Sequence, residues 1–209
     1  MDTLYYYPGA CSLSVHAVLE ETRHPYVARK IDIHGGDNET AAYLAIHPRG
    51  LVPALVTDGG IFTEAPAILL HLAEAHPEAR LLPPVGTAAR TRCYEWLLLG
   101  ATYPHPAFSR LMRAERFVSD PQATEAVFER GKADFWEALQ HIDRRLGGST
   151  FALGDAYSIC DPYLMIFYFW GRLVGMPVGE LAAYSKLVAN VVERPAVRKV
   201  IAEEQLPLA

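Results

Sequence analysis

The chain has 209 residues, of which 51% are hydrophobic and 21% are charged. This composition supplies a hydrophobic core and excludes a disordered chain, and the length fits one large domain or two compact ones. The 24 acidic residues outnumber the 19 Lys and Arg residues, which gives a formal charge of -5. Nucleic acid is therefore not an expected partner, because phosphate binding requires an excess of positive charge.

The three cysteines, Cys11, Cys93 and Cys160, are widely spaced and form no CxxC pair. Such a set is typical neither of a disulfide framework nor of a zinc site. The N-terminus shows no basic stretch followed by an apolar run, and the longest apolar stretch, residues 159–170, is interrupted by an Asp-Pro pair and is too short to span a bilayer. We expect a cytoplasmic protein with no membrane partner.

The first 80 residues mix short apolar runs with turn residues. A strand is predicted at residues 4–7, where a β-rich run stops at a Pro-Gly pair, and apolar residues at helical spacing follow. A second strand is predicted at residues 26–33. A short helix beginning at Asn38 or Thr40 then ends at residues 48–50.

The next segment predicts a hairpin and a helix. Residues 54–57 and 61–63 are apolar runs separated by Asp-Gly-Gly, which is typical of two strands joined by a glycine-containing turn. Pro66 suits the first turn of a helix, where its missing N–H costs nothing. The predicted order of the first part is βαβ-ββα, with the short helix in the crossover.

Three prolines and a glycine between residues 77 and 86 mark a linker, so we place a domain boundary near residues 80–88. Beyond it the apolar residues recur at helical spacing, and Gly147-Gly148 supplies a helix stop. Residues 158–161 match a capping box, in which the Ser hydroxyl accepts from the third helical amide and the Asp reaches back to the N-cap amide. The box opens an apolar helix at residues 162–174, which we place at the centre of a helical bundle.

Four motifs in order carry a resemblance to a known family: Tyr-Tyr-Pro-Gly-Ala-Cys-Ser-Leu-Ser at residues 6–14, Pro-Arg-Gly-Leu-Val-Pro-Ala-Leu at 48–55, Glu-Ala-Pro-Ala-Ile at 64–68, and the box at 158–161. Over its full length the chain resembles the cytosolic glutathione transferases, most closely the bacterial cysteine-type, beta-class-like members. Each motif is weak alone, but four at the expected intervals are a strong fold signal.

The resemblance implies an α+β fold, with a thioredoxin-like N-terminal domain at residues 1–80 and an all-α helical-bundle C-terminal domain at residues 88–209. It also implies a homodimer, with glutathione as co-substrate and a small hydrophobic electrophile in an apolar acceptor pocket of the second domain. Residues expected to line that pocket, unless they pack in the core, are Tyr103, Phe108, Leu111, Met112 and Phe167.

Cys11 follows a predicted strand and directly precedes a helix. The unpaired amides and the positive end of the helix dipole there predict a thiolate. We interpret Cys11 as a residue that contacts the glutathione sulfur or forms a reversible mixed disulfide with it. The alternative is a small buried residue at a loop corner. Cys93 and Cys160 lie inside predicted helical segments without an activating neighbour, and we interpret both as structural.

Glutathione needs a strand-like edge for its peptide backbone and partners for its γ-glutamyl group. In the family that the chain resembles, the residue matching Pro53 takes the cis form, which exposes the Val52 amide and carbonyl to the peptide. Glu64 lies at a strand-to-helix junction, where its carboxylate is expected to bind the ammonium while helix amides face the carboxylate. Ordinary helix-start electrostatics is the alternative reading of Glu64.

Two positions depart from the family. Ala65 stands where a Ser usually bonds the glutamyl carboxylate, and the loss of such a bond costs about 1.5 to 3 kcal/mol. Leu98 stands where bacterial members often carry a polar residue. The Ala65 amide survives, so we expect weakened rather than abolished glutathione binding.

The resemblance adds four more candidate residues. His105 matches a His that bacterial relatives present to the sulfur across the cleft, which makes it a candidate thiolate stabiliser, with a purely structural role as the alternative. Tyr6 is implied to line the site, although the equivalent Tyr is usually a bystander in the cysteine type. His34 and Arg49 are candidates for the glycyl carboxylate, and each reads equally well as a solvated loop residue.

These residues predict a glutathione transferase that conjugates the glutathione thiolate to small apolar electrophiles. Two alternatives stay open: a glutathione-dependent thiol-disulfide reductase that works through Cys11, and a non-catalytic binding protein that kept the fold. The absence of paired metal-ligand spacing predicts no metal centre.

Overall fold

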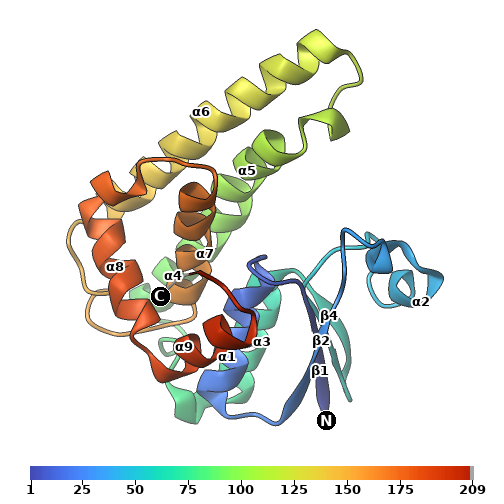
Figure 1. The fold of residues 1–209 in the computed structure, drawn as a ribbon. Coiled ribbons are helices and arrows are strands. Elements are labelled where there is room, and N and C mark those ends of the chain that lie inside the picture. Colours follow the sequence, from blue (N-terminus) through green and yellow to red (C-terminus); the bar gives the residue numbers. More distant parts are fainter. Residues whose placement is uncertain (208–209) are drawn as a thin grey trace.

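The computed structural model describes residues 1–207, so the last two residues of the predicted helical segment lie outside the described part. The first part is built on a four-stranded sheet in the order β2-β1-β3-β4 (Figure 1). Strands β1 (Asp2–Tyr6) and β2 (Tyr26–Lys30) pair in parallel, whereas β3 (Ala54–Thr57) and β4 (Gly60–Thr63) continue the sheet in antiparallel pairing. The predicted order of strands and the hairpin are confirmed.

Two helices, α1 (Ser12–Thr22) and α3 (Ala65–Ala75), pack side by side on one face of the sheet, and the short α2 (Ala41–Leu44) lies on its other side (Figure 1). Leu4 and Leu55 pair across β1 and β3 and are fully buried in the core. β2 is shorter than predicted, because a turn closed by the Asp37 amide on the Asp32 carbonyl follows it.

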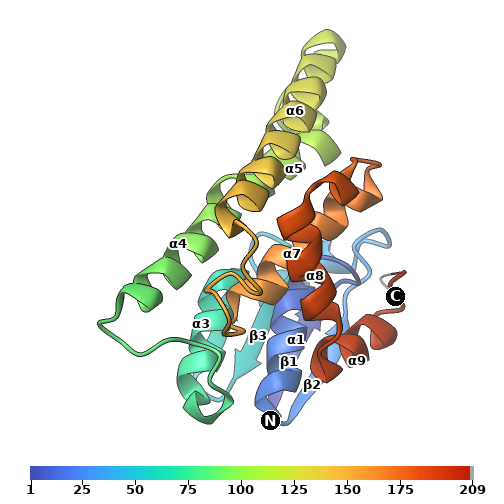
Figure 2. The same ribbon diagram turned by 90° about the vertical axis from the view of Figure 1, so that its left-hand side faces the viewer.

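The second part is helical, as predicted. It contains α4 (Ala88–Thr102), α5 (Pro104–Met112), α6 (Pro121–Leu146), α7 (Cys160–Leu173), α8 (Ala182–Val192) and α9 (Pro195–Glu203). The α5 and α6 helices form an arm that extends away from the sheet, and α9 returns to pack on α1 (Figures 1 and 2). α6 ends at Gly147 in a left-handed conformation, and α7 is buried along most of its length, both as expected.

The start of α7 departs in one detail from the predicted capping box. The Asp161 carboxylate accepts from the Ser158 amide at 2.7 Å, as predicted, and also from the Ala152 amide at 2.7 Å. The Ser158 hydroxyl, however, accepts from the Cys160 amide at 3.3 Å and donates to Asp161 at 3.0 Å, because the Asp161 amide bonds to the Ser158 carbonyl instead, at 3.2 Å. Within residues 1–207 no helix has the length and apolar character that crossing a membrane requires.

Candidate active site

Cys11 is the N-cap residue of α1 and lies beside the Val52–Pro53 peptide bond, which is cis as expected. Its Sγ donates to the Val52 carbonyl at 3.5 Å. The side chain is buried, with 8% of the residue exposed. The structure therefore brings three predicted site residues, Cys11, Val52 and Pro53, to one point at the end of the sheet.

The predicted thiolate at Cys11 is wrong for the protein without a ligand. Burial raises the pKa of the Cys11 thiol to about 12, and the negative charge of Glu64 raises it further, against a lowering by the amides of Cys11 and Ser12. Desolvation of an anion outweighs the favourable end of the helix. Cys11 is a neutral thiol that donates a hydrogen bond.

The loop before Cys11 is held from both sides by the helical part of the chain. The Gly9 amide donates to Glu204 Oε2 at 2.9 Å, and Trp170 Nε1 donates to the Gly9 carbonyl at 2.8 Å. Gly9 has a φ of 72°, and an added Cβ would lie 3.1 Å from the Phe169 ring, so a glycine is needed here. Trp170 and Glu204 were not predicted, because their partner lies more than 160 residues away in sequence.

His105 lies on α5, and its ring packs edge-on against Trp170 with centroids 5.2 Å apart. Since Trp170 also bonds the Gly9 carbonyl, this indole links His105 to the loop that ends at Cys11. Burial lowers the pKa of His105, while the charge of Glu64 raises it and that of Arg113 lowers it. His105 is thus a neutral imidazole near neutral pH, and one ring nitrogen carries a proton that it can donate.

Glu64 is the N-cap residue of α3 and has a φ of 66°, a conformation that costs a non-glycine residue free energy and is often found at functional sites. Its carboxylate pairs with Arg49, Nη1 to Oε1, at 3.2 Å, and both side chains are largely exposed. The structure thus brings Arg49 together with Glu64, the residue expected to bind the γ-glutamyl ammonium.

Ala65 is buried in the first turn of α3. Pro66 has no N–H, and the Ala67 amide bonds to the Glu64 carbonyl at 3.0 Å. Within the described residues, the Ala65 amide is the first-turn donor that remains for an anion. His34, the other candidate for the glycyl carboxylate, is exposed and lies edge-on to Tyr7, with centroids 5.7 Å apart.

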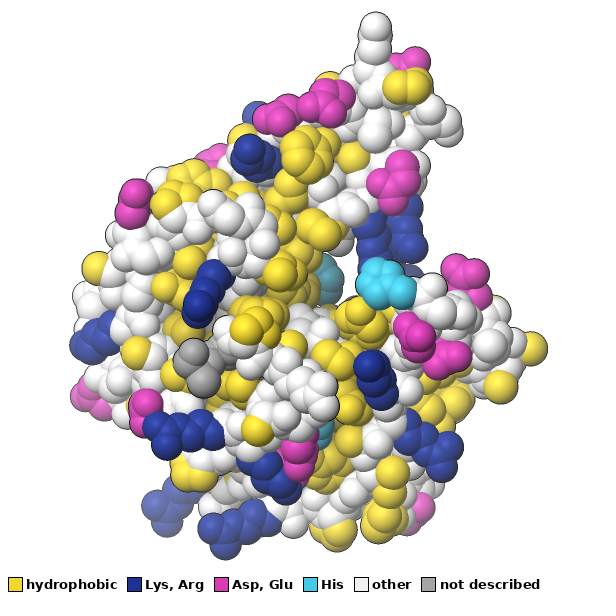
Figure 3. Space-filling view, viewed as in Figure 1, with side chains coloured by type: hydrophobic (Ala, Val, Ile, Leu, Met, Phe, Trp, Pro, Cys, Tyr) yellow, Lys and Arg dark blue, Asp and Glu magenta, His cyan; other side chains and the backbone are white. Residues whose placement is uncertain are grey.

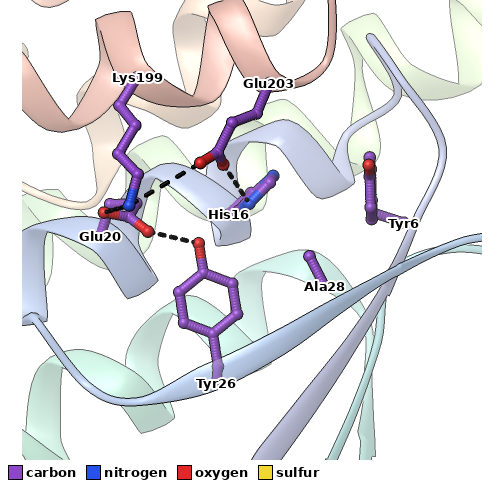
Figure 4. Close-up of a pocket in the computed structure, with 7 residues that line it drawn as sticks. All are labelled: Tyr6, His16, Glu20, Tyr26, Ala28, Lys199 and Glu203. Carbon is purple, nitrogen blue, oxygen red and sulfur yellow. Dashed lines mark hydrogen bonds and ion pairs between the residues drawn. The ribbon is translucent and has the colours of Figure 1, made fainter.

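Tyr6 lies apart from this group of residues. Its ring packs against His16, with centroids 5.2 Å apart, and lines a cavity of about 350 Å³ between α1, β2 and α9 (Figure 4). β2 is the strand at the opposite edge of the sheet from β4, which precedes Glu64. The other residues drawn around this cavity are His16, Glu20, Tyr26, Ala28, Lys199 and Glu203.

The residues expected to line the acceptor pocket differ in burial and in what they pack against. Leu111 and Phe167 are buried in the core, and Tyr103 lies edge-on to His141 of α6. Phe108 stacks on Trp170, and Met112 is 50% exposed. Figure 3 shows a hollow between the arm and the first part of the molecule, bordered by cationic and histidine side chains.

A thioredoxin-like sheet with a cysteine at the start of α1, a cis-proline beside its sulfur and a helical region over it defines the glutathione-transferase class of proteins. Residues 4–80 match the family model of the glutathione S-transferase N-terminal domain. Glutathione S-transferase GstA of Escherichia coli O157:H7 is 31% identical over 97% of this chain and 98% of its own. The chain belongs to the glutathione S-transferase family.

Solved structures agree with this assignment. A glutathione transferase homologue from Sulfitobacter with bound glutathione superposes with a TM-score of 0.93, at 26% identity over 99% of each chain. A sphingomonad glutathione S-transferase complexed with glutathione gives a TM-score of 0.85, at 31% identity over 98% of this chain and 99% of its own. Both comparisons cover the sheet and the helical part together.

Proposed function

We propose that this glutathione transferase conjugates glutathione to small electrophiles, with the glutathione sulfur held between Cys11 and His105. The observation that carries the proposal is the position of the Cys11 thiol, 3.5 Å from the Val52 carbonyl beside cis-Pro53. His105 is tied to the loop before Cys11 through Trp170, whose indole packs edge-on against the His105 ring and donates to the Gly9 carbonyl. A neutral thiol and a neutral imidazole each donate a hydrogen bond, and two such donors stabilise the glutathione thiolate.

The same proposal assigns the rest of the tripeptide. The Val52 backbone pairs with the cysteinyl backbone, Glu64 binds the γ-glutamyl ammonium, and the Ala65 amide binds its carboxylate. Arg49 forms an ion pair with Glu64, and we assign it to the γ-glutamyl carboxylate as well. His34 stays a candidate for the glycyl end, and Tyr6 is left out because it lines the cavity under α9.

The reductase alternative requires Cys11 to attack a disulfide as a thiolate. A pKa near 12 leaves almost no thiolate at neutral pH, which argues against this role. Replacing Cys11 with Ala separates the two functions. Conjugation should persist in part in this variant, since His105 still donates a hydrogen bond to the glutathione sulfur. Any disulfide reduction that the wild type catalyses should vanish.

The test is to titrate the purified protein with glutathione by calorimetry, with intact mass measured in parallel. We expect saturable binding and no mass increase of a glutathionyl group. Tight retention without conjugation of any electrophile would favour the binding-protein alternative, and a mixed disulfide at Cys11 would favour the reductase.

We also propose a homodimer and keep the division into domains at 1–80 and 88–209. Tyr94 and Leu98 lie one turn apart on α4, and Ile61 lies on the edge strand β4; all three are exposed, Leu98 to 61%. A second copy of the chain that packs on these exposed apolar side chains would remove them from water, which favours self-association. Sedimentation of Leu98→Arg beside the wild type tests this, with a monomer expected for the variant.

A cytoplasmic location stays a prediction.

A further inference from the structure

Three residues follow one another at intervals of four along α5 and its C-terminal cap. The Ser109 hydroxyl donates to the His105 carbonyl at 3.0 Å, and the Arg113 amide donates to the Ser109 carbonyl at 3.0 Å. These are steps of four residues, so His105, Ser109 and Arg113 share a face of the helix. Arg113 is the C-cap residue that follows the last residue of α5, Met112.

The Arg113 side chain lies within electrostatic reach of His105. Eight residues correspond to about 12 Å along a helix, a separation that the long Arg side chain can shorten. The positive charge of Arg113 lowers the pKa of His105. The guanidinium therefore belongs to the surroundings of the ring that is proposed to contact the glutathione sulfur.

Arg113 has no anionic partner among residues 1–207 within ion-pair distance, whereas Arg110, on the same helix, pairs with Asp134 at 2.9 Å. Arg113 is half-buried, and burial together with the charge of Arg116 lowers its pKa, while Glu115 offsets this only in part. A partly desolvated cation without a counterion is unfavourable. Its position favours a ligand that brings a negative charge.

Figure 3 shows charged and histidine side chains around the hollow between the arm and the first part of the molecule. The Glu64 carboxylate comes from the first part of the chain and Arg113 from the arm, and both act on His105. Met112, exposed beside Arg113, supplies apolar surface for the body of an acceptor.

We propose that Arg113 selects acceptor substrates that carry an anionic group, a carboxylate or sulfonate, near the electrophilic carbon. This inference rests on the proposed transferase function and replaces the expectation of a wholly apolar electrophile. Arg113 binds the anion while the glutathione thiolate, held at Cys11 and His105, attacks the electrophilic carbon. Bidentate pairing of a guanidinium with a carboxylate fixes the orientation of the acceptor as well as its affinity.

The test compares two electrophiles that differ only in charge, 4-chloro-3,5-dinitrobenzoate and its neutral carboxamide. In both, the glutathione sulfur forms a bond to C4, the C4–Cl bond breaks, chloride leaves, and the thiol proton passes to the buffer. The measured quantity is kcat/KM for each, divided by the uncatalysed rate constant with glutathione. The wild type should prefer the benzoate, and Arg113→Gln should lose about 10- to 100-fold of that preference, the value of one charge-assisted hydrogen bond.

Three controls make the result specific. Arg113→Lys should restore part of the preference, because it keeps the charge and loses the planar fork. Arg172→Gln, an exposed substitution on α7, should leave both substrates unchanged. The dissociation constant of glutathione should be the same in the wild type and in Arg113→Gln.

An equal loss for both electrophiles, or a weaker dissociation constant for glutathione in Arg113→Gln, would overturn the inference, since Arg113 would then support the helix or bind the tripeptide. If neither electrophile is conjugated by the wild type, the transferase proposal itself fails. Calorimetry with the two preformed glutathione conjugates then decides on Arg113. Tighter binding of the carboxylate conjugate, lost in Arg113→Gln, would retain the anion site, and equal binding would remove it.

Discussion

Two helices of this protein begin at a cysteine, and their starts differ in a way that bears on function. Cys11 is the N-cap residue of α1, and Cys160 is the first residue of α7. Burial raises the pKa of both thiols. A helix N-terminus alone therefore does not produce a thiolate in this chain.

The two helix starts differ in what satisfies their amides. At α7 the Cys160 amide donates to the Ser158 hydroxyl at 3.3 Å and the Asp161 amide to the Ser158 carbonyl at 3.2 Å. The buried Asp161 carboxylate in turn accepts from the Ser158 amide and hydroxyl, so the positive end is closed by the protein itself. At α1 no side chain caps the helix, and the Cys11 thiol points to the Val52 carbonyl at the edge of the proposed glutathione site. The closed start stabilises the fold, and the open one leaves room for the sulfur of a ligand.

The largest expected effect comes from opening the closed start. Asp161→Ala leaves the Ala152 amide and the Ser158 amide and hydroxyl without their acceptor in a buried environment, which should cost about 3 to 5 kcal/mol in the free energy of unfolding. Urea unfolding followed by circular dichroism measures this. Asp155→Ala is the matched control, because its carboxylate accepts from the Thr150 hydroxyl in an exposed hydrogen bond, and its effect should stay below about 0.5 kcal/mol. Equal effects of the two variants would show that the box is not what holds α7.

The second prediction concerns the open start and its pH dependence. A thiol with a pKa of about 12 is more protonated at every pH below 12 than an ordinary cysteine, whose pKa is about 8.5. Alkylation of Cys11 by iodoacetamide at pH 7.5 should therefore be at least 100-fold slower than that of free glutathione. The rate should rise about tenfold per pH unit up to pH 10 without a plateau. Intact mass followed over time gives the rate, and a plateau below pH 8 would contradict the burial argument.

Much of the fold could be predicted from sequence because its signals are local. The hairpin at Asp58-Gly59-Gly60, the helix stop at Gly147 and the carboxylate of the capping box depend on neighbouring residues and are confirmed. The protonation state of Cys11 could not be predicted, because it is decided by burial against Val52 and by the charge of Glu64, which are set by tertiary packing.

In the candidate site, too, the features set by short motifs could be predicted and those set by tertiary packing could not. The positions of Val52, Pro53 and Glu64 follow from short motifs, whereas the bonds from Trp170 and Glu204 to Gly9 join the two ends of the chain. Alternation along β1 indicates that Tyr6 shares a face with Leu4, which points toward α1. Only the packing of α9 over that face shows that Tyr6 lines a separate cavity.

A third helix start, that of α3, offers an effect of intermediate size. It is open like that of α1, with the Ala65 amide as its donor, and Ala65→Ser adds a hydroxyl that can bond the glutamyl carboxylate. We expect glutathione to bind about tenfold more tightly, the low end of the range for a charge-assisted hydrogen bond, since Arg49 already lies beside Glu64. Calorimetric titration measures it, with Ala67→Ser, two residues further along α3, as the control. Unchanged affinity would mean that the carboxylate is bound elsewhere.

The smallest expected effect tests whether the helical part holds the open start of α1 in place. Trp170→Phe removes the bond from Nε1 to the Gly9 carbonyl but keeps an aromatic ring beside His105 and Phe108. The loss of one neutral hydrogen bond should lower the free energy of unfolding by about 1 kcal/mol. It should also lower kcat/KM severalfold, because a loop that moves two residues before Cys11 misplaces the thiol. Gly9 keeps its bond to Glu204, so the loop is loosened rather than released. A stability loss with unchanged kcat/KM would show that Trp170 supports packing only, and that Cys11 is positioned by α1 and Val52 without help from the helical part.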